Sequence, residues 1–476
     1  MRQWMVAAKK ADFYAIAEKF HVDPVVARII RNREVIGEKN IRIYLGGNLS
    51  DLSDPHQMKD MDRLVEILAQ KIRKQVHIRI IGDYDVDGVT SSHLFLTALR
   101  RVGAKVDVVI PHRIQDGYGL SLHLLQQAKE DGVDTILTCD NGIAAIDEIA
   151  WAKAQKMTVL VTDHHAVPFE EHEGRRTEKK SLADAVVNPH QQDCGYPYKE
   201  LCGAGVAWNV IRVLYENYDM DKREAEDLLD FVAMATVCDV MSLTGENRIL
   251  VKEGLKRIRH TKNIGLQALM QACNVQPENI SAYHFGYVLG PCVNATGRLD
   301  TARHALRLFE TGQETEAEEI ARDLVDLNQE RKELTLQGVE MAKKLCEEGG
   351  YENDPVLVLF LPDVHESIAG LIAGRIREMY NRPVFVLTRG EEGVKGSGRS
   401  TENYSMYENM CGCAELFTKF GGHPMAAGLS LPEENVEKFR RKINENCPLT
   451  VEEVCPDIHI DMAMPVGYAS TELVHQ

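Results

Sequence analysis

The sequence predicts an α/β protein of two domains: a larger one built on a mostly parallel sheet, and a smaller one joined to it by a long connector helix. Three observations predict this fold class. Short apolar runs alternate with helix-spaced segments from residue 77 onward, one helical period extends from about residue 315 to 348, and strand-like runs return after residue 350. Strands that alternate with helices favour a parallel sheet whose two faces are both covered.

The first domain is expected at residues 76–312, after a polar helical segment at residues 1–75. A helix is predicted at residues 89–102, where apolar residues recur at helical spacing. Residues 203–312 are predicted to be largely helical. The strands of this domain are expected at residues 77–81, 106–110, 135–138, 158–161 and 185–187.

A long helix is predicted to connect the two domains at residues 313–349. Residues 315–318 (TEAE) have the form of a capping box, which starts a helix. Apolar residues then recur at helical spacing as far as Leu345, with charged residues between them. A capped helix of this length is unusual inside one domain, so we interpret it as a connector. The second α/β domain is expected at residues 350–447, with its first strands at residues 356–360 and 384–387.

Residues 448–476 are expected to begin a further module. Residues 457–461 (DIHID) alternate polar and apolar side chains like the first strand of a new sheet. One strand cannot bury a face by itself, and fewer than about 40 residues rarely fold alone. We therefore expect these residues to be poorly packed or to pair with the edge of the second domain.

Composition excludes several classes of protein. The 476 residues suffice for two or three domains, and 44% hydrophobic with 27% charged residues is typical of a soluble globular protein. No apolar stretch approaches the length of a membrane helix, and eleven cysteines without a regular framework indicate a reduced, cytoplasmic protein. The net charge of −17 argues against bulk attraction to a polyanion. It does not exclude a nucleic-acid enzyme, because metal ions can neutralise acids and a groove can be locally basic.

Acids and imidazoles follow three of the predicted strands. The first strand runs into Asp83, Asp85 and Asp87, whose alternation places them on one side of an extended segment. Later strands end at Asp140 and at residues 163–165 (DHH). The carboxyl ends of parallel strands line one crevice, so these side chains are expected to meet there. The sequence therefore predicts a metal site at this edge of the sheet.

A fourth acid, Asp239, follows an apolar helix predicted at residues 228–237. Several carboxylates with one or two imidazoles favour Mn²⁺ or Mg²⁺ over a thiolate-rich zinc site. Cys139 and Cys238 adjoin the candidate ligands, but neighbours on a strand point to opposite faces, so we interpret both as packing residues. Taken alone, each motif has an ordinary interpretation as a calcium loop, an Asx turn or a helix cap. Their succession at strand ends favours the metal site.

These motifs resemble a known family. Residues 82–88 (GDYDVDG), 138–142 (TCDNG), 163–165 (DHH) and 235–239 (ATVCD) resemble the four ordered motifs of the DHH phosphoesterase superfamily. Further segments resemble its RecJ branch: residues 111–119, 294–298 (NATGR), 363–370, 395–400 and 421–428 (GGHPMAAG), the last being the hallmark of the DHHA1 domain. The resemblance covers about residues 40 to 465. It implies a DHH-type catalytic domain, a DHHA1-type substrate-binding domain, and, at residues 448–476, the start of a truncated OB-type module.

The resemblance also implies an activity: hydrolysis of single-stranded DNA from its 5′ end to 5′-mononucleotides, in DNA repair and recombination. Two ions, Mn²⁺ or Mg²⁺, would be held by Asp85, Asp87, Asp140, His164 and Asp239, with Asp140 bridging them. Two such ions about 3.5–4 Å apart generate a hydroxide and neutralise the charge that grows on the phosphate.

Three residues are implied to act beside the ions. Asp83 would be a further ligand or a neighbour of the ligands, Asp163 would orient an imidazole, and His165 would contact the scissile phosphate. The DNA and its 5′ end would be held by Arg113, Arg298, Ser397 or Ser400, Arg399, Gly422 and His423. Arg298 has an alternative as a buried salt-bridge partner, and the glycines of the second domain have one as residues of tight turns.

Other functions of the same superfamily remain alternatives. A nanoRNase, a cyclic-dinucleotide phosphodiesterase or a manganese pyrophosphatase shares the metal site, but such enzymes are typically shorter and lack the connector and the segment at residues 294–298. A non-catalytic scaffold has no reason to retain mutually repelling carboxylates. Single-stranded DNA is the expected partner, with single-strand-binding protein and a helicase as candidates, and we expect a monomer without membrane contact.

Overall fold

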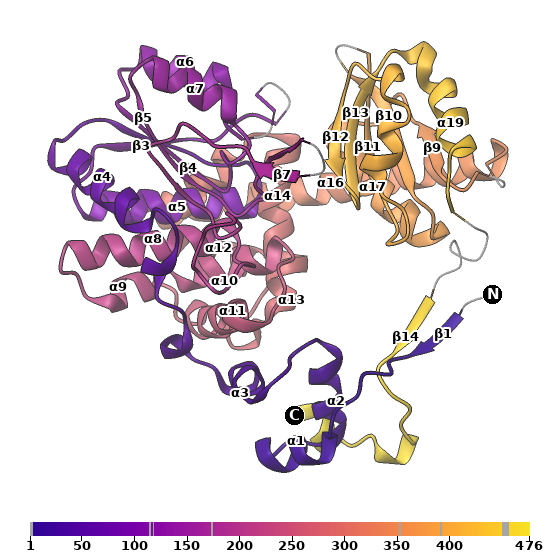
Figure 1. Cartoon of the computed structure of the whole chain (residues 1–476), viewed down its shortest axis with the longest axis horizontal. Coiled ribbons are helices and arrows are strands. Elements are labelled where there is room, and N and C mark those ends of the chain that lie inside the picture. The colour runs from indigo at the N-terminus through magenta and orange to yellow at the C-terminus, as the bar shows by residue number, and fades with distance from the viewer. Residues whose placement is uncertain are drawn as a thin grey trace. The chain divides into compact units, whose positions relative to one another are not determined.

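The computed structural model describes residues 3–113, 116–117, 119–172, 175–351, 354–390, 393–449 and 457–476. The chain divides into two compact units, one formed by Val35–Asn328 and the other by Met1–Glu34 together with Gln329–Gln476. Figure 1 shows the elements of both. Over the described ranges, none of the helices combines the length and hydropathy that a membrane span requires.

A five-stranded parallel sheet forms the centre of the Val35–Asn328 unit. Its strands lie in the order β3 (Val106–Val109), β2 (Ile78–Ile81), β4 (Thr135–Cys139), β5 (Thr158–Thr162) and β8 (Ala185–Val187). Every pairing between neighbours is parallel. The central strands β2 and β4 are buried along their whole length because helices cover both faces of the sheet. The predicted fold class is confirmed.

Consecutive residues of one strand pack into different cores on the two faces of this sheet. Ile136 of β4 packs with α6 (Leu122–Glu130) and α7 (Ile146–Ala154). Leu137 packs on the other face with α4 (Met61–Arg73), α5 (Val86–Arg101) and α8 (Gly203–Asn217). Since α5 follows β2 directly, the end of β2 is fixed between the sheet and a buried helix.

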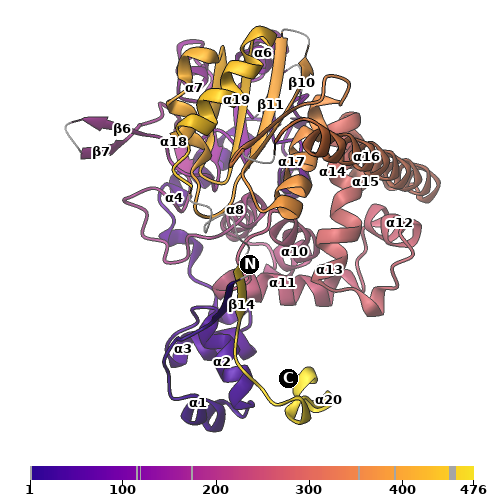
Figure 2. The ribbon, with the colours of Figure 1, turned by 90° about the vertical axis from the view of Figure 1, so that its right-hand side faces the viewer.

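Helices make up most of the remaining unit. They are α3 (Glu38–Gly46), α9 (Lys222–Glu226), α10 (Leu229–Cys238), α11 (Gly245–Ile258), α12 (Ile264–Ala272), α13 (Ala282–His284), α14 (Gly290–Leu299) and α15 (Arg303–Glu310). A hairpin of β6 (Phe169–His172) and β7 (Arg175–Glu178) extends away from the sheet, as Figure 2 shows. The predicted long helix is α16 (Glu314–Glu348), whose residues are shared between the two units.

The second unit contains a mixed five-stranded sheet. Its order is β12 (Lys419–His423), β13 (Ala426–Leu431), β11 (Gly393–Arg399), β10 (Val384–Gly390) and β9 (Leu357–Phe360). Within this sheet, β9 and β10 pair in parallel, and the other neighbouring strands pair antiparallel. One face packs against α17 (Glu366–Tyr380), and the other against α18 (Met406–Cys411) and α19 (Val436–Glu445).

A parallel ribbon joins two distant parts of the sequence. β1 (Gln3–Val6) pairs with β14 (Asp457–Ile460), and Figure 1 shows the two strands side by side. The adjoining helices are α1 (Phe13–Phe20), α2 (Pro24–Asn32) and α20 (Thr471–His475). The strand predicted at residues 457–461 is therefore present. Most of the described residues after it are exposed, as the prediction of poor packing expected, whereas the alternative of pairing with the edge of the second domain is wrong. The partner of β14 is β1, which was not predicted.

Candidate metal centre

Acidic and imidazole side chains gather where three parallel strands end. Asp83 follows β2, Asp140 follows β4, and His164 follows β5. Asp239 reaches the same place as the C-cap of α10. Potential ligand atoms within 4.8 Å of one another form three overlapping groups: Asp83, Asp85 and Asp140; Asp87, His164 and Asp239; and Asp140, His164 and His165. The seven side chains therefore form one continuous cluster.

Asp85 and Asp87 reach this cluster through a helix start rather than along an extended strand. Asp85 is the N-cap of α5, and its Oδ1 accepts a hydrogen bond from the Gly88 amide at 3.1 Å. Asp87 lies in the first helical turn. The predicted extended alternation of the three aspartates is therefore wrong, because an aspartate that caps the backbone starts a helix at this point.

The N-terminus of α8 fixes the carboxylate of Asp87. Its two oxygens accept hydrogen bonds from the amides of Gly203 at 2.6 Å and Ala204 at 2.7 Å. A helix leaves its first amides without internal partners, and its dipole favours a negative charge at this end. A Cβ at position 203 would lie 2.6 Å from Asp140 Cβ, so the close approach of α8 requires a glycine.

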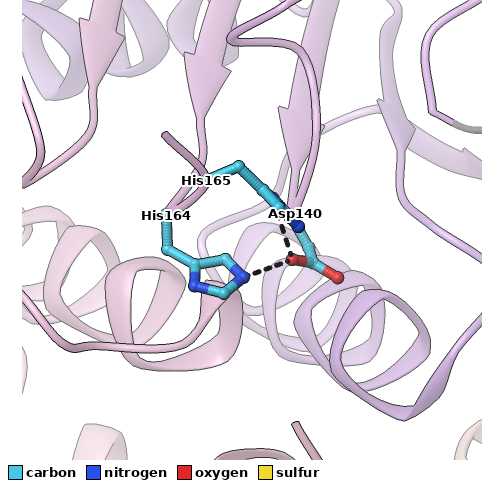
Figure 3. Close-up of side chains that lie close together, drawn as sticks. All are labelled: Asp140, His164 and His165. Carbon is cyan, nitrogen blue, oxygen red and sulfur yellow. Dashed lines mark ion pairs between the residues drawn. The ribbon is translucent and has the colours of Figure 1, made fainter. Parts of the chain in front are cut away.

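Asp140 lies at the centre of the cluster. It is buried and has a left-handed backbone with φ 61°, which is uncommon outside glycine. Its Oδ1 lies 3.1 Å from His164 Nε2 and 3.9 Å from His165 Nδ1 (Figure 3). His164 Nε2 also lies 3.7 Å from Asp87 Oδ2 and 3.6 Å from Asp239 Oδ2. One imidazole nitrogen thus faces three carboxylates.

The buried carboxylates repel one another unless a cation lies among them. Burial and the charges of four neighbouring aspartates raise the pKa of Asp140 well above its ordinary value. Burial and the charges of Asp87 and Asp85 raise the pKa of Asp239 to about 8. A divalent cation favours the ionised carboxylates and displaces their protons.

The donor atoms fit a hard divalent cation. Asp83 Oδ1 and His164 Nε2 are buried and make no well-aligned hydrogen bond among the described residues, although His164 Nε2 lies 3.1 Å from Asp140 Oδ1. Buried polar atoms are nearly always partnered, so these two atoms fit coordination to an ion. Oxygen-rich sites with an imidazole suit Mn²⁺ or Mg²⁺. The thiols take no part: Cys139 Sγ lies 3.5 Å from Ser92 Oγ, and Cys238 Sγ donates to the Phe285 carbonyl at 3.3 Å.

Asp163 holds His165 in place. Its Oδ1 lies 2.8 Å from His165 Nδ1 and accepts hydrogen bonds from the amides of His164 and His165, while Oδ2 accepts one from the Ile143 amide. Burial alone lowers the pKa of His165, but the hydrogen bond and charge of Asp163, with other nearby aspartates, raise it to about 9. His165 is therefore a cation at neutral pH, with a partly exposed ring.

Two of the predicted DNA-binding arginines lie beside the loop between β2 and α5. The guanidinium of Arg113 lies 4.7 Å from the centre of the Tyr84 ring. Burial raises the pKa of Tyr84 to about 12, and the charges of Arg113 and Arg298 oppose that shift. Arg113 is also within electrostatic reach of Asp83 in the carboxylate cluster, and Arg298 is within reach of Tyr84. Arg298 is partly buried, and its alternative as an ion-pair partner stays a prediction.

In the second unit, Arg399 and Ser397 lie together on β11. A Cβ at Gly370 of α17 would lie 2.8 Å from Arg399 Nη2 and 3.1 Å from Ser397 Oγ, so all three meet. Ser400 is buried, and its hydroxyl donates to the Tyr404 carbonyl at 2.5 Å. Ser397 is therefore the better candidate of the two serines for contact with a ligand.

Packing requires one of the two consecutive glycines of β12 (Gly421 and Gly422). Gly422 has φ 151°, and a Cβ there would lie 2.5 Å from the Ala426 carbonyl oxygen. The hairpin therefore explains this glycine without a ligand. Gly421, in contrast, faces open space, and His423 is exposed. These two remain candidates for contact with a phosphate.

Two contributions to the centre were missed from the sequence. One is the pair of amides at Gly203 and Ala204, for which the glycines of residues 202–205 (CGAG) before a helix were a usable signal. The other is Asn294, whose Oδ1 accepts a hydrogen bond from the Val86 amide at 3.1 Å and so ties α14 to the start of α5.

Comparison with known proteins identifies two family domains and several relatives of the chain. Residues 77–236 match the model of the DHH family, N-terminal domain, and residues 353–447 match the DHHA1 domain. The single-stranded-DNA-specific exonuclease RecJ of Haemophilus influenzae is 36% identical over 440 residues, which cover 89% of this chain and 74% of that protein. That of Bacillus subtilis is 33% identical over 464 residues, or 97% of this chain and 57% of that protein. The chain thus spans little more than half the length of the Bacillus relative.

A solved structure shares the arrangement. RecJ from Thermus thermophilus in complex with Mn²⁺ superposes with a TM-score of 0.81 and 28% identity, covering 97% of this chain and 65% of that one. A second structure, an exonuclease RecJ bound to manganese, gives a TM-score of 0.71 at 31% identity and covers 83% of this chain and 96% of that one.

Proposed function

The chain belongs to the RecJ family of DHH proteins, and from that premise we propose that it is a divalent-metal-dependent exonuclease that degrades single-stranded DNA from the 5′ end to 5′-mononucleotides. The relatives that carry the name RecJ are single-stranded-DNA-specific exonucleases. The two RecJ structures described above contain manganese. We propose Mn²⁺ or Mg²⁺ as the ions of this chain.

One observation carries the proposal: two of the three overlapping groups of ligand residues share no member, and each of these two contains a buried atom that makes no hydrogen bond among the described residues. Asp83 Oδ1 belongs to the group with Asp85 and Asp140, and His164 Nε2 to the group with Asp87 and Asp239. Two groups suit two ions. A phosphodiester requires such help because both attack and departure concentrate negative charge.

The ions would supply an activated water and neutralise the phosphate charge. The residues of the chain do the rest. The two amides at the N-terminus of α8 hold the carboxylate of Asp87 in place. Asp163 keeps His165 protonated, so that its Nε2 can donate to a phosphate oxygen. Arg113 and Arg298 add positive charge beside Tyr84.

Hydrolysis assays on three kinds of substrate test this function. We expect a long single strand labelled at its 5′ end to release labelled mononucleotides in Mn²⁺ or Mg²⁺, and no product in EDTA. Dinucleotides and pyrophosphate should be poor substrates. Preferential hydrolysis of a dinucleotide would favour the nanoRNase or cyclic-dinucleotide alternative. Asp140→Asn, which keeps the shape of the side chain and tolerates the left-handed backbone, should abolish cleavage while the fold is retained.

Arg399 and Ser397 are proposed to hold the 5′ phosphate. Arg399→Ala should weaken binding of a 5′-phosphorylated strand more than that of a 5′-hydroxyl strand, because the guanidinium pairs with phosphate oxygens. Arg389→Ala is a matched control, since Arg389 is an exposed arginine of the neighbouring strand paired with Glu433. Equal losses on the two strand types would remove Arg399 from the end-binding site.

A cellular setting follows from the family. We propose a cytoplasmic monomer that acts in DNA repair and recombination, with single-strand-binding protein and a helicase as partners. Light scattering tests the monomer. Stimulation of degradation by single-strand-binding protein on a coated strand tests the first partner, and an unchanged rate would argue against it.

A further inference from the structure

Two tyrosines stack on the surface of the Val35–Asn328 unit. Tyr283 and Tyr287 are 62% and 72% exposed, and their rings lie 5.2 Å apart at an interplanar angle of 25°. A π-helical turn, η4 (Phe285–Leu289), includes Tyr287 and joins α13 to α14 without a break. Exposed aromatic rings in contact with each other are an apolar surface that water solvates poorly, and such surfaces commonly mark binding sites.

The helix that carries the tyrosines leads to the carboxylate cluster. At its C-terminal end, Asn294 binds the Val86 amide, and Arg298 lies within electrostatic reach of Tyr84. In its middle, a Cβ at Gly290 would lie 2.3 Å from Cys238 Sγ, the residue before Asp239. The helix therefore passes two of the segments that supply candidate metal ligands.

An accessible stripe connects the tyrosines to Arg298. Along α14 most side chains are buried, whereas Pro291, Asn294, Arg298 and the terminal Leu299 remain partly exposed. Pro291, Asn294 and Arg298 recur at intervals of three and four residues, which is one face of an α-helix, and Tyr287 precedes Pro291 by four residues across the π-helical turn. Tyr287 and Arg298 are eleven residues apart, or at most about 16 Å at the α-helical rise of 1.5 Å per residue, because the π-helical turn rises less. That distance corresponds to about five nucleotides at a rise of 3.4 Å, and to fewer in a more extended strand.

We propose that Tyr283 and Tyr287 form a stacking platform for bases of the single strand whose end lies at the carboxylate cluster. This inference rests on the proposed exonuclease function and adds residues that position the substrate. The platform meets the strand at about the third to fifth nucleotide. Stacking on a ring tolerates every base, as a non-specific exonuclease requires. A duplex cannot present its bases in this way, because they remain paired and stacked inside the helix.

A fluorescent base locates the contact. Asp140→Asn serves as the inactive host, and 2-aminopurine is placed in turn at each of the first several positions of a 5′-phosphorylated strand. Stacking on tyrosine should change the fluorescence most near the third to fifth position. Tyr283→Ala/Tyr287→Ala in the same host should remove this change. The same profile in host and variant would refute the platform.

Kinetics provide the second readout. In the active chain, Tyr283→Ala/Tyr287→Ala should raise KM for a long strand about fivefold or more, the effect of losing one stacked base, with a smaller change in kcat. The ratio of kcat/KM between a long strand and a trinucleotide should fall accordingly. Tyr283→Phe/Tyr287→Phe should restore most of the affinity, because the ring is kept. Tyr14→Ala, at an exposed tyrosine of the other unit, is the control.

The outcomes separate this inference from the function beneath it. If the parent chain degrades single strands but the double alanine variant keeps the parent ratio between long and short substrates, the platform is refuted and the exonuclease function stands. If the parent chain degrades no strand in either metal, the proposed function fails first. Loss of affinity in the phenylalanine variant equal to that in the alanine variant would assign the hydroxyl groups, rather than stacking, to the contact.

Discussion

Asp239→Asn should stabilise the metal-free protein at neutral pH. Burial and the charges of Asp87 and Asp85 raise the pKa of Asp239 to about 8, whereas an unfolded aspartate titrates near 3.9. Because the folded state holds the proton of Asp239 more tightly than the unfolded state does, protonation of Asp239 contributes stability. This contribution is fully present below about pH 3.9 and is lost as the pH rises towards 8. Between about pH 5 and pH 7.5 this loss amounts to about 3 kcal/mol. The asparagine variant lacks this contribution.

Urea unfolding in EDTA measures the effect, with the fluorescence of Trp208, buried in the same unit, as the probe. We expect the stability gain of Asp239→Asn over the parent to be about 3 kcal/mol larger at about pH 7.5 than at about pH 5. Mn²⁺ should stabilise the parent more at the higher pH, and the variant less. Asp227→Asn, at an exposed acid of this unit, is the control. A variant no more stable than the parent at the higher pH would refute the account of the repelling carboxylates.

Three further perturbations test the surroundings of the cluster. Gly203→Ala places a Cβ 2.6 Å from that of Asp140, so it should lower the free energy of unfolding by about 1–3 kcal/mol and weaken Mn²⁺ binding. Gly374→Ala, at a glycine with open space around it, should have neither effect. Burial, with the charge of Arg100, lowers the pKa of His93 to about 3, so stability is lost as the pH falls below about 6.5. In urea unfolding, the free energy of unfolding should fall between about pH 7.5 and pH 5, and His93→Leu should remove about 2 kcal/mol of that fall. Asp163→Asn should lower the pKa of His165 and move the alkaline limb of the pH–rate profile to lower pH; an unmoved limb would exclude His165 as its source.

The strands that carry the site were predictable because each is a local signal. β2 and β4 are short apolar runs, and the acids follow them directly in the sequence. The hairpin of β6 and β7 was missed because residues 169–178 are mostly charged and show no apolar alternation. β1 was missed because it has only four residues and its partner lies at the other end of the sequence. Such pairings are set by tertiary contacts, which a local pattern does not contain.

The candidate site was likewise predictable where the signal is local and not where it depends on tertiary contacts. The residue types and their order indicated a cluster of carboxylates and imidazoles, and these side chains do lie together. The contacts that hold these side chains in place could not be predicted from a local sequence pattern. The amide that binds Asp87 lies 116 residues further along the chain, at Gly203. The helix start at Asp85 depended on whether its side chain capped the backbone or extended along a strand, and both are common for aspartate.

The ribbon of β1 and β14 can form only late in the synthesis of the chain. Gln3 pairs with Asp457, so the first strand leaves the ribosome 454 residues before its partner. At about 5–20 residues per second, this interval is about 20 to 90 s. The apolar side chains of Trp4, Met5 and Val6 and the open edge of β1 are without this partner throughout that time, which exposes the nascent chain to chaperones and to wrong pairing. Closure of the ribbon is thus a late step, and the βα core can form long before it.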